Sequence, residues 1–298
     1  MADVTTQKAS RKALCVGINK FQNYPQFALN GCVNDAQDMA ALFKELLAVR
    51  AADIITLTDA NATKANIMAQ LKALVAEAKA GKLSYLAFSF SSHGTQVKDS
   101  SGDEEDGMDE AFVPYDIAQK GGDWDPAHVI CDDEFHDLFE QLPTTCAFEA
   151  FLDTCHSGTG FKDPSIRPRY ILPISEPALG KSKKVRGFTM KRSSGRVSKR
   201  AGGRKSIEGG VPDADITTAK NIILWTGCRS NQTSADAFFN GRYNGAFTYN
   251  YVKVMRGSGG KQSRAEVLAS MKKLMAGQFD QIPQLEADAT NRKNQIEQ

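Results

Sequence analysis

The sequence contains no long run of apolar residues. Nowhere in its 298 residues do about 18 apolar residues follow one another, the length that a membrane-spanning helix requires. The amino-terminal segment MADVTTQKASRKALCVGI also lacks the apolar stretch of roughly 7 to 15 residues that precedes the cleavage site of a secretory signal peptide. We therefore expect a cytoplasmic protein that makes no membrane contact.

Clustered cysteines and glycine-rich nucleotide motifs are also missing. The six cysteines are scattered along the chain, so free thiols in a reducing compartment are expected rather than a disulfide framework. No G-x-x-x-x-G-K-[ST] motif occurs, and no G-x-G-x-x-G follows the first expected strand. The motifs that usually indicate a nucleotide-binding protein are therefore missing from this sequence.

The net charge of +2 results from two regions of opposite sign. Between Lys181 and Lys205, eleven residues are Lys or Arg and none is acidic. Without those eleven, 26 basic residues face 35 acidic ones, so the rest of the chain has a net charge of −9. We expect an acidic body that carries one basic, polar surface segment.

Short apolar runs alternate with helical patterns, which predicts βα units around a mainly parallel sheet. Asn34 or Asp35 is the expected amino-terminal cap of the first helix. Between Lys98 and Cys131 an acidic, glycine-containing loop interrupts the alternation. The expected strands are 12–18, 53–58, 83–92, 146–153 and 220–227, with a short one within 281–287, and the expected helices are 34–49, 61–81, 132–142, 245–257 and 263–277.

Two of the expected strands lead into residues that can support hydrolysis. His93 follows the third strand and Cys155 the fourth, and the carboxyl ends of parallel strands meet at one edge of a sheet. An imidazole near a thiol favours the thiolate and can protonate a leaving amine, as in a cysteine hydrolase. The adjoining His156 is a poorer partner for Cys155, because consecutive residues of an extended segment point to opposite sides. The amides of Gly94 and Cys155 are candidate oxyanion donors.

Each of these residues also has an ordinary alternative. A cysteine at the end of a buried strand is most often inert, and a lone histidine is more often structural than catalytic. A zinc site made of Cys131, His136, Cys155 and His156 is disfavoured, because these residues lack the paired short spacings of structural zinc sites.

Five blocks of the sequence, in this order, resemble the signature blocks of metacaspases, which are caspase-like cysteine peptidases. They are FSFSSHGTQ, DEEDGMDEAFVPYD, ICDDEFHDLF, FLDTCHSGTG and TGCRSNQTSADAFFNGRYNGAFTY. The nucleophile block of caspases proper reads Q-A-C-[RQG]-G, so the segment around Cys155 is closer to metacaspases. The resemblance implies an α/β fold of the caspase-hemoglobinase type, with a mainly parallel central sheet flanked by helices.

The resemblance also implies a domain organisation. Residues 1–298 are expected to form one catalytic domain that acts as a monomer, with a larger part at 12–178, a flexible basic linker at 179–212 and a smaller part at 213–298. The sequence shows no Pro/Gln-rich or zinc-finger extension of the kind that many metacaspases carry. Ser92 stands where the family usually has glycine, which is expected to alter the local turn only.

By the same resemblance, the reaction is hydrolysis of protein or peptide substrates after Arg or Lys, with Cys155 as nucleophile and His93 as general acid and base. A buried basic side chain needs carboxylate partners. The residues that the family's pattern assigns to this pocket are Asp35, Ser91, Asp153 and Asp236. The ordinary structural alternative for Asp35 is a role as the amino-terminal cap of a helix, and the two roles are compatible.

Metacaspases commonly depend on calcium, and the resemblance points to four ligands. They are Asp109, Asp132, Asp133 and Asp163. The alternative for Asp132 and Asp133 is that they begin a helix and favour its dipole. The acidic segment does not fit the EF-hand pattern, so the calcium expectation rests on the resemblance and on acidic density.

The basic segment suggests self-cleavage between residues 180 and 206, because an acidic pocket and an accessible basic segment belong to one molecule. Its rival is a basic patch that binds nucleic acid or an anionic surface, and nucleic-acid binding is disfavoured because the segment lacks interleaved aromatic residues and a known motif. The alternative to a peptidase is a non-catalytic protein that binds basic peptides.

Overall fold

The computed structural model describes residues 10–98, 108–155, 166–174, 221–229 and 232–296. The whole basic linker expected at 179–212, together with His156 and Asp163, lies outside the described residues.

A six-stranded sheet forms the centre of the molecule. Its strands, in spatial order, are β14 (Gln284–Glu286), β11 (Ile222–Thr226), β9 (Ala147–Asp153), β3 (Leu83–Ser91), β1 (Ser10–Gly17) and β2 (Ile54–Thr58). All neighbours run parallel except β14, which pairs antiparallel with β11 at the edge. The prediction of a mainly parallel sheet is therefore confirmed.

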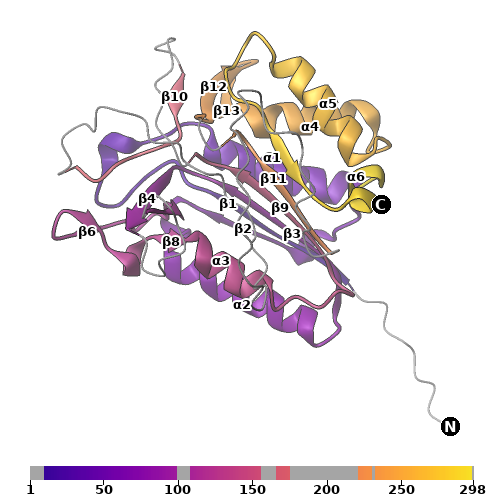
Figure 1. The fold of residues 1–298 in the computed structure, drawn as a ribbon, viewed down its shortest axis with the longest axis horizontal. Coiled ribbons are helices and arrows are strands. Elements are labelled where there is room, and N and C mark those ends of the chain that lie inside the picture. The colour runs from indigo at the N-terminus through magenta and orange to yellow at the C-terminus, as the bar shows by residue number, and fades with distance from the viewer. Residues whose placement is uncertain (1–9, 99–107, 156–165, 175–220, 230–231, 297–298) are drawn as a thin grey trace, which may run out of the picture.

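Helices cover both faces of this sheet. They are α1 (Cys32–Leu46), α2 (Lys64–Lys79), α3 (Asp132–Phe139), α4 (Ala246–Ser258), α5 (Arg264–Met275) and α6 (Ala289–Lys293). In Figure 1, α2 and α3 lie together on one side of the sheet, and α1, α4 and α5 lie on the other. Within the described part of the chain, no helix is long and apolar enough to cross a bilayer.

Two large apolar clusters fill the space between the sheet and the two helical layers. Aromatic rings of the sheet and of the helices meet in both. Phe88 of β3 contacts Phe135 of α3 on one face, with ring centroids 5.4 Å apart, and Phe151 of β9 contacts Tyr251 of α4 on the other, at 4.9 Å. Burial on both faces explains why the central strands appear as continuous apolar runs in the sequence.

The first helix begins earlier than the sequence predicts. Gly31 is its cap residue, so the prediction that Asn34 or Asp35 caps it is wrong. The side-chain oxygen of Asn19 accepts the backbone N–H of Cys32 at 2.8 Å. A residue from the preceding loop thereby satisfies a free donor of the first turn, and Asp35 is available for another role.

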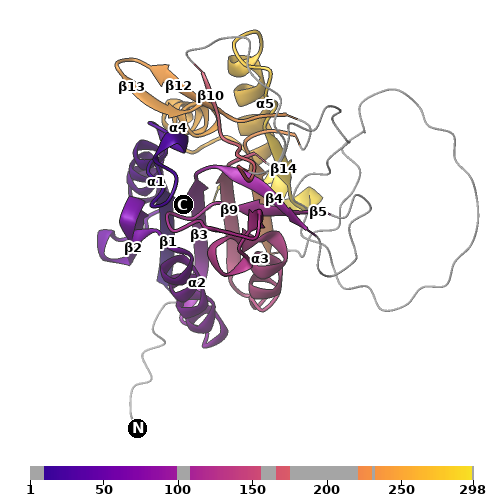
Figure 2. The same cartoon turned by 90° about the vertical axis from the view of Figure 1, so that its left-hand side faces the viewer.

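Among the described residues, three small sheets lie outside the central one. They are β4 (Gly94–Lys98), β5 (Met108–Phe112) and β8 (Ile130–Cys131); β6 (Gln119–Lys120) and β7 (Asp123–Trp124); and β10 (Arg167–Pro168), β12 (Ala235–Phe239) and β13 (Arg242–Gly245). Figures 1 and 2 show β4 and β10 beside the carboxyl ends of the central strands. The loop that the sequence predicts between Lys98 and Cys131 thus contains β5 to β8, three of which have only two residues and so produce no periodic pattern.

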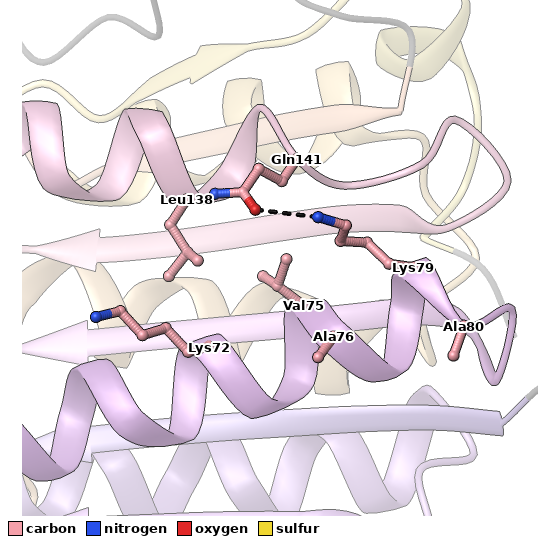
Figure 3. Close-up of a pocket in the computed structure, with 7 residues that line it drawn as sticks. All are labelled: Lys72, Val75, Ala76, Lys79, Ala80, Leu138 and Gln141. Carbon is pink, nitrogen blue, oxygen red and sulfur yellow. Dashed lines mark hydrogen bonds between the residues drawn. The ribbon is translucent and has the colours of Figure 1, made fainter.

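A groove between α2 and α3 lies at the other end of the sheet. Figure 3 shows the stems of Lys72 and Lys79 on one side of it, Leu138 and Gln141 on the other, and the bond of 3.2 Å from Lys79 Nζ to Gln141 Oε1. Because α2 leads directly into the start of β3, this groove is separated from the carboxyl edge by the length of the strands.

A buried ion pair fixes α5 against the sheet. Glu149 of β9 accepts two hydrogen bonds from the Arg264 guanidinium, both at 2.9 Å. It also accepts the Trp225 indole N–H at 2.7 Å and the Tyr85 hydroxyl at 2.9 Å. Every oxygen of this buried carboxylate therefore has a donor.

We predict that Glu149→Ala lowers the free energy of unfolding by about 3 to 5 kcal/mol, because it leaves the Arg264 charge buried without a carboxylate partner. The matched control is Glu45→Ala, which breaks an exposed pair with Arg256 and should change stability by less than about 1 kcal/mol. Urea denaturation measures both, and equal losses in the two variants would contradict the prediction.

Candidate active site

The register between β3 and β9 sets the position of the two candidate catalytic residues. Ser91 pairs with Asp153 in this parallel ladder. His93 and Cys155 each lie two residues beyond that pair, so both reach the same edge of the sheet. A methyl group added at Gly94 would overlap the carbonyl oxygen of Cys155, so the two backbones touch. Only glycine permits this approach.

A backbone carbonyl orients His93. The ring Nε2 lies 2.7 Å from the carbonyl oxygen of Phe27, and because a carbonyl can only accept, Nε2 carries the proton. Among the described residues, the buried Nδ1 has no hydrogen-bond partner. Burial lowers the pKa of His93 to about 4, and the positive charge of Arg169 acts in the same direction. His93 is thus neutral, with Nδ1 available as a base.

Cys155 is fully buried at the end of β9. The backbone N–H of Ser234 donates to its sulfur, and the Cys228 Sγ lies 3.8 Å away. Burial raises the pKa of the Cys155 thiol well above its ordinary value, and the neighbouring Cys228 adds to the shift. The two candidate catalytic groups are therefore a neutral thiol and a neutral imidazole in this conformation.

The four predicted pocket residues converge on a residue that the sequence analysis did not anticipate, Arg169. Its buried guanidinium lies 2.7 Å from the Asp35 carboxylate, 3.3 Å from Asp153 and 3.1 Å from Asp236, and it donates to the Ser91 hydroxyl at 2.6 Å. No pattern in the sequence distinguishes Arg169 from the other arginines near it. Its position depends on a chain segment that returns to the sheet edge after Cys155.

Other donors hold the three carboxylates in place. Asp35 accepts the side-chain amide of Asn244 at 2.9 Å, and Asp236 accepts the backbone N–H groups of Asn30 and Gly31, both at 2.9 Å. Asp153 accepts both the N–H and the hydroxyl of Thr248, at 3.0 and 2.7 Å.

The pocket carries more negative than positive charge. Three carboxylates surround one guanidinium, and burial raises the pKa of Asp35 to about 6 although Arg169 acts in the opposite direction. A methyl group at Gly245 would overlap both Asp153 and Arg169, so that wall of the pocket is backbone. The site is built to hold a cation in a confined space.

The backbone of Arg169 also uses a predicted oxyanion donor. The Gly94 amide donates to the carbonyl oxygen of Arg169 at 2.9 Å, and the Arg169 amide donates to the Ser234 carbonyl at 3.1 Å. The Gly94 N–H is therefore engaged by this chain's own peptide group. Ser92, which stands where the family usually has glycine, donates its hydroxyl to the Val113 carbonyl at 2.7 Å.

Three of the four predicted calcium ligands lie on β5 and at the start of α3, outside the carboxylate cluster around Arg169. Asp109 is buried on β5, which pairs with β8, and β8 leads directly into α3. Asp132 and Asp133 occupy the first turn of that helix, after the cap residue Cys131. Within the described ranges, no three side chains of the ligating types form a group that could hold a metal. The fourth predicted ligand, Asp163, is outside those ranges.

Comparison with known proteins identifies the family. A family model described as "Metacaspase, peptidase C14 domain" matches residues 11–164, just over half of the chain. The chain belongs to the metacaspase family. It is 32% identical to Metacaspase-1 of Cryptococcus neoformans over 294 residues and 32% identical to Metacaspase-1 of Botryotinia fuckeliana over 293. These alignments cover 93% and 92% of the chain but only 62% and 67% of the two relatives.

Solved structures agree with this fold. A protein from Geobacter sulfurreducens superposes with a TM-score of 0.63 at 26% identity, covering 97% of this chain and 98% of that one. Caspase-1 from Spodoptera frugiperda superposes with a TM-score of 0.56 at 11% identity, covering 94% and 89%. The second likeness concerns the fold alone, and it confirms the caspase-like architecture expected of a metacaspase.

The buried His93 should make the stability of this metacaspase depend on pH. Its pKa is about 4 when folded and ordinarily 6.5, so the unfolded chain binds the extra proton first as pH falls through this range. The stabilising contribution is complete above pH 6.5 and is lost toward pH 4. It amounts to about 3 kcal/mol.

We expect the free energy of unfolding to fall more steeply between pH 6.5 and 4 in the wild type than in His93→Asn. The difference at pH 7.5 serves as the control, because it contains only the packing change. Denaturant titrations at each pH measure the effect, and parallel pH profiles would contradict the prediction.

Proposed function

We propose that the protein is a cysteine endopeptidase that cleaves after Arg or Lys, with Cys155 as nucleophile and His93 as general acid and base. One observation carries the specificity. Three buried carboxylates, from Asp35, Asp153 and Asp236, surround a guanidinium beside the candidate dyad. A pocket that holds one arginine in this way has the charge and hydrogen-bond geometry for another.

The proposed chemistry follows from the two groups at the sheet edge. His93 Nδ1 takes the proton of the Cys155 thiol as its sulfur bonds to the scissile carbonyl carbon. The same nitrogen then gives the proton to the amine as the C–N bond breaks, which leaves a thioester. Water, deprotonated by His93, hydrolyses the thioester and restores the thiol. The backbone amides of Gly94 and Cys155 donate hydrogen bonds to the oxyanion that forms during the attack.

Hydrolysis of fluorogenic peptides by the full chain tests this proposal. Arg- or Lys-ended peptides should be cut on the order of a hundredfold or more faster than their norleucine-ended equivalents, because a neutral side chain leaves the pocket carboxylates unpaired. Cys155→Ala should abolish turnover.

A pair of aspartates one helical turn apart supplies the matched control. Asp35→Asn should reduce the ratio of Arg to norleucine cleavage by about tenfold or more. Asp38 pairs with Arg242 and also accepts the Asn244 amide, at 2.9 Å. Asp38→Asn keeps an oxygen that can accept this amide and loses only a charge that does not face Arg169, so it should change the ratio much less than Asp35→Asn does. Without Arg- or Lys-ended turnover, with and without calcium, the peptidase proposal fails. Retained peptide binding would then favour a non-catalytic binder of basic peptides.

We further propose that calcium activates the enzyme and that the enzyme cuts its own chain between residues 180 and 206. We also propose that the enzyme acts as a cytoplasmic monomer. Support for calcium comes from the family and from the carboxylates of Asp109, Asp132 and Asp133 around β5, β8 and the start of α3. Because the described residues alone do not assemble a complete site, Asp163 or backbone oxygens would have to complete it.

A calcium titration tests the first two of these points together. Peptide hydrolysis and the appearance of new amino termini should both rise with calcium in the wild type. Asp133→Asn should need on the order of tenfold more calcium. Asp137→Asn changes an exposed aspartate of the same helix and should behave as the wild type. An intact chain at every calcium concentration would refute self-cleavage, and a flat activity titration would refute activation.

A further inference from the structure

The strand β10 lies along the substrate side of the pocket as an added edge strand. Arg167 pairs with Asp236 and Pro168 with Ala235 in an antiparallel ladder, so β10 extends the β12–β13 hairpin by one strand. Adding an extended segment to a sheet edge is a common way for proteins to bind peptides, with backbone bonds for affinity and side-chain pockets for specificity.

Arg169, the next residue, has the contacts of a substrate residue at the point of cleavage. Its amide donates to the Ser234 carbonyl and its carbonyl accepts the Gly94 amide, at 3.1 and 2.9 Å. The second bond involves the donor that would stabilise an oxyanion. Its side chain fills the acidic pocket completely, since Arg169 is 0% exposed. Backbone and side chain thus occupy the positions that a peptide with a carboxyl-terminal arginine would take.

We propose that residues 167–169 form a resident inhibitor that mimics a substrate, in which Arg169 occupies the specificity pocket and must leave before an arginine or lysine of another chain can enter. This inference rests on the proposed function, because it concerns the same pocket. It assigns to the segment after Cys155 a role that is separate from cleavage in the basic linker.

The contacts of the nucleophile and of the chain beyond Arg169 explain why the segment is held and not cut. The Cys155 sulfur accepts a hydrogen bond from the Ser234 amide. The chain beyond Arg169 is also anchored. Ile171 donates its N–H to the Gly94 carbonyl at 3.1 Å, and its own carbonyl accepts the Thr95 hydroxyl at 2.7 Å.

Only one side chain of the segment enters the pocket. Arg167 and Pro168 are exposed, and Arg167 donates to the Ala28 carbonyl at 2.7 Å. Arg167 is therefore a matched control for Arg169. It has the same chemistry on the same strand, two residues away, and it lies outside the cluster of carboxylates.

Thermal unfolding of the full chain with agmatine, a small guanidinium compound, tests the proposal without reference to catalysis. Arg169→Gln and Arg169→Ala should each have a lower Tm than the wild type, because the pocket carboxylates lose their partner. Agmatine should restore the Tm of both in a concentration-dependent way, as expected of a ligand that binds only the folded state. The wild type and Arg167→Gln should show no shift.

If either Arg169 variant folds only with agmatine, that supports the proposal. If agmatine shifts neither Arg169 variant, the pocket is not exchangeable and the proposal is wrong.

Peptide kinetics give a second readout. The KM for an Arg-ended peptide should be about tenfold or more lower in Arg169→Gln than in the wild type or Arg167→Gln, because the fraction of open pocket limits apparent affinity. Equal KM values in folded, active proteins would overturn the inference and leave the peptidase proposal intact. If no variant cuts any Arg- or Lys-ended peptide, the peptidase proposal fails, and the agmatine shift alone decides whether Arg169 is an exchangeable occupant.

Discussion

The parallel pairing of β3 with β9 is the constraint on which the site depends. Ser91 and Asp153 face each other in this ladder, and the residues two positions further on are His93 and Cys155. A slip of one residue would turn every side chain of one strand to the opposite face. Such a slip is blocked because it would move Glu149 of β9 away from Arg264, Trp225 and Tyr85, which donate hydrogen bonds to its two oxygens. The packing of the sheet therefore sets the spacing of the dyad.

Removal of water determines the charge state of Cys155 and His93 at this edge. Burial disfavours the thiolate of Cys155 and the imidazolium of His93, so both are neutral. The same burial makes an unpaired carboxylate in the pocket unfavourable, and Arg169 supplies the counter-charge. For the activation proposed above, two things must therefore change, the occupant of the pocket and the hydration of the candidate dyad. Displacing the segment that covers the edge would do both, because water could then reach the sulfur.

The sequence predicted the elements with long patterns and missed those that depend on contacts between distant segments. The six strands of the sheet and the helices α1 to α5 follow from apolar periodicity, and the ends of β3 and β9 were visible because His93 and Cys155 interrupt apolar runs. Asn19, whose side chain caps α1, and Phe27, whose carbonyl orients His93, have no local signature. Any residue offers a carbonyl, so only the fold reveals which one is used.

Arg169 illustrates the same limit and has a consequence for specificity. On the proposed function, the carboxylates that would select a basic substrate are the same ones that bind Arg169, so weakening one of them weakens both interactions. The two effects partly cancel in the absolute KM, because a looser pocket also releases Arg169 more readily. They do not cancel in the ratio of Arg to norleucine cleavage, since both substrates compete with the same occupant.

Selectivity and latency are thus two results of one cluster of charges. A pocket can become more selective for arginine only by also holding its own arginine more tightly, unless the two are distinguished by contacts outside it. The exposed Arg167 and Pro168 lie where such contacts would form.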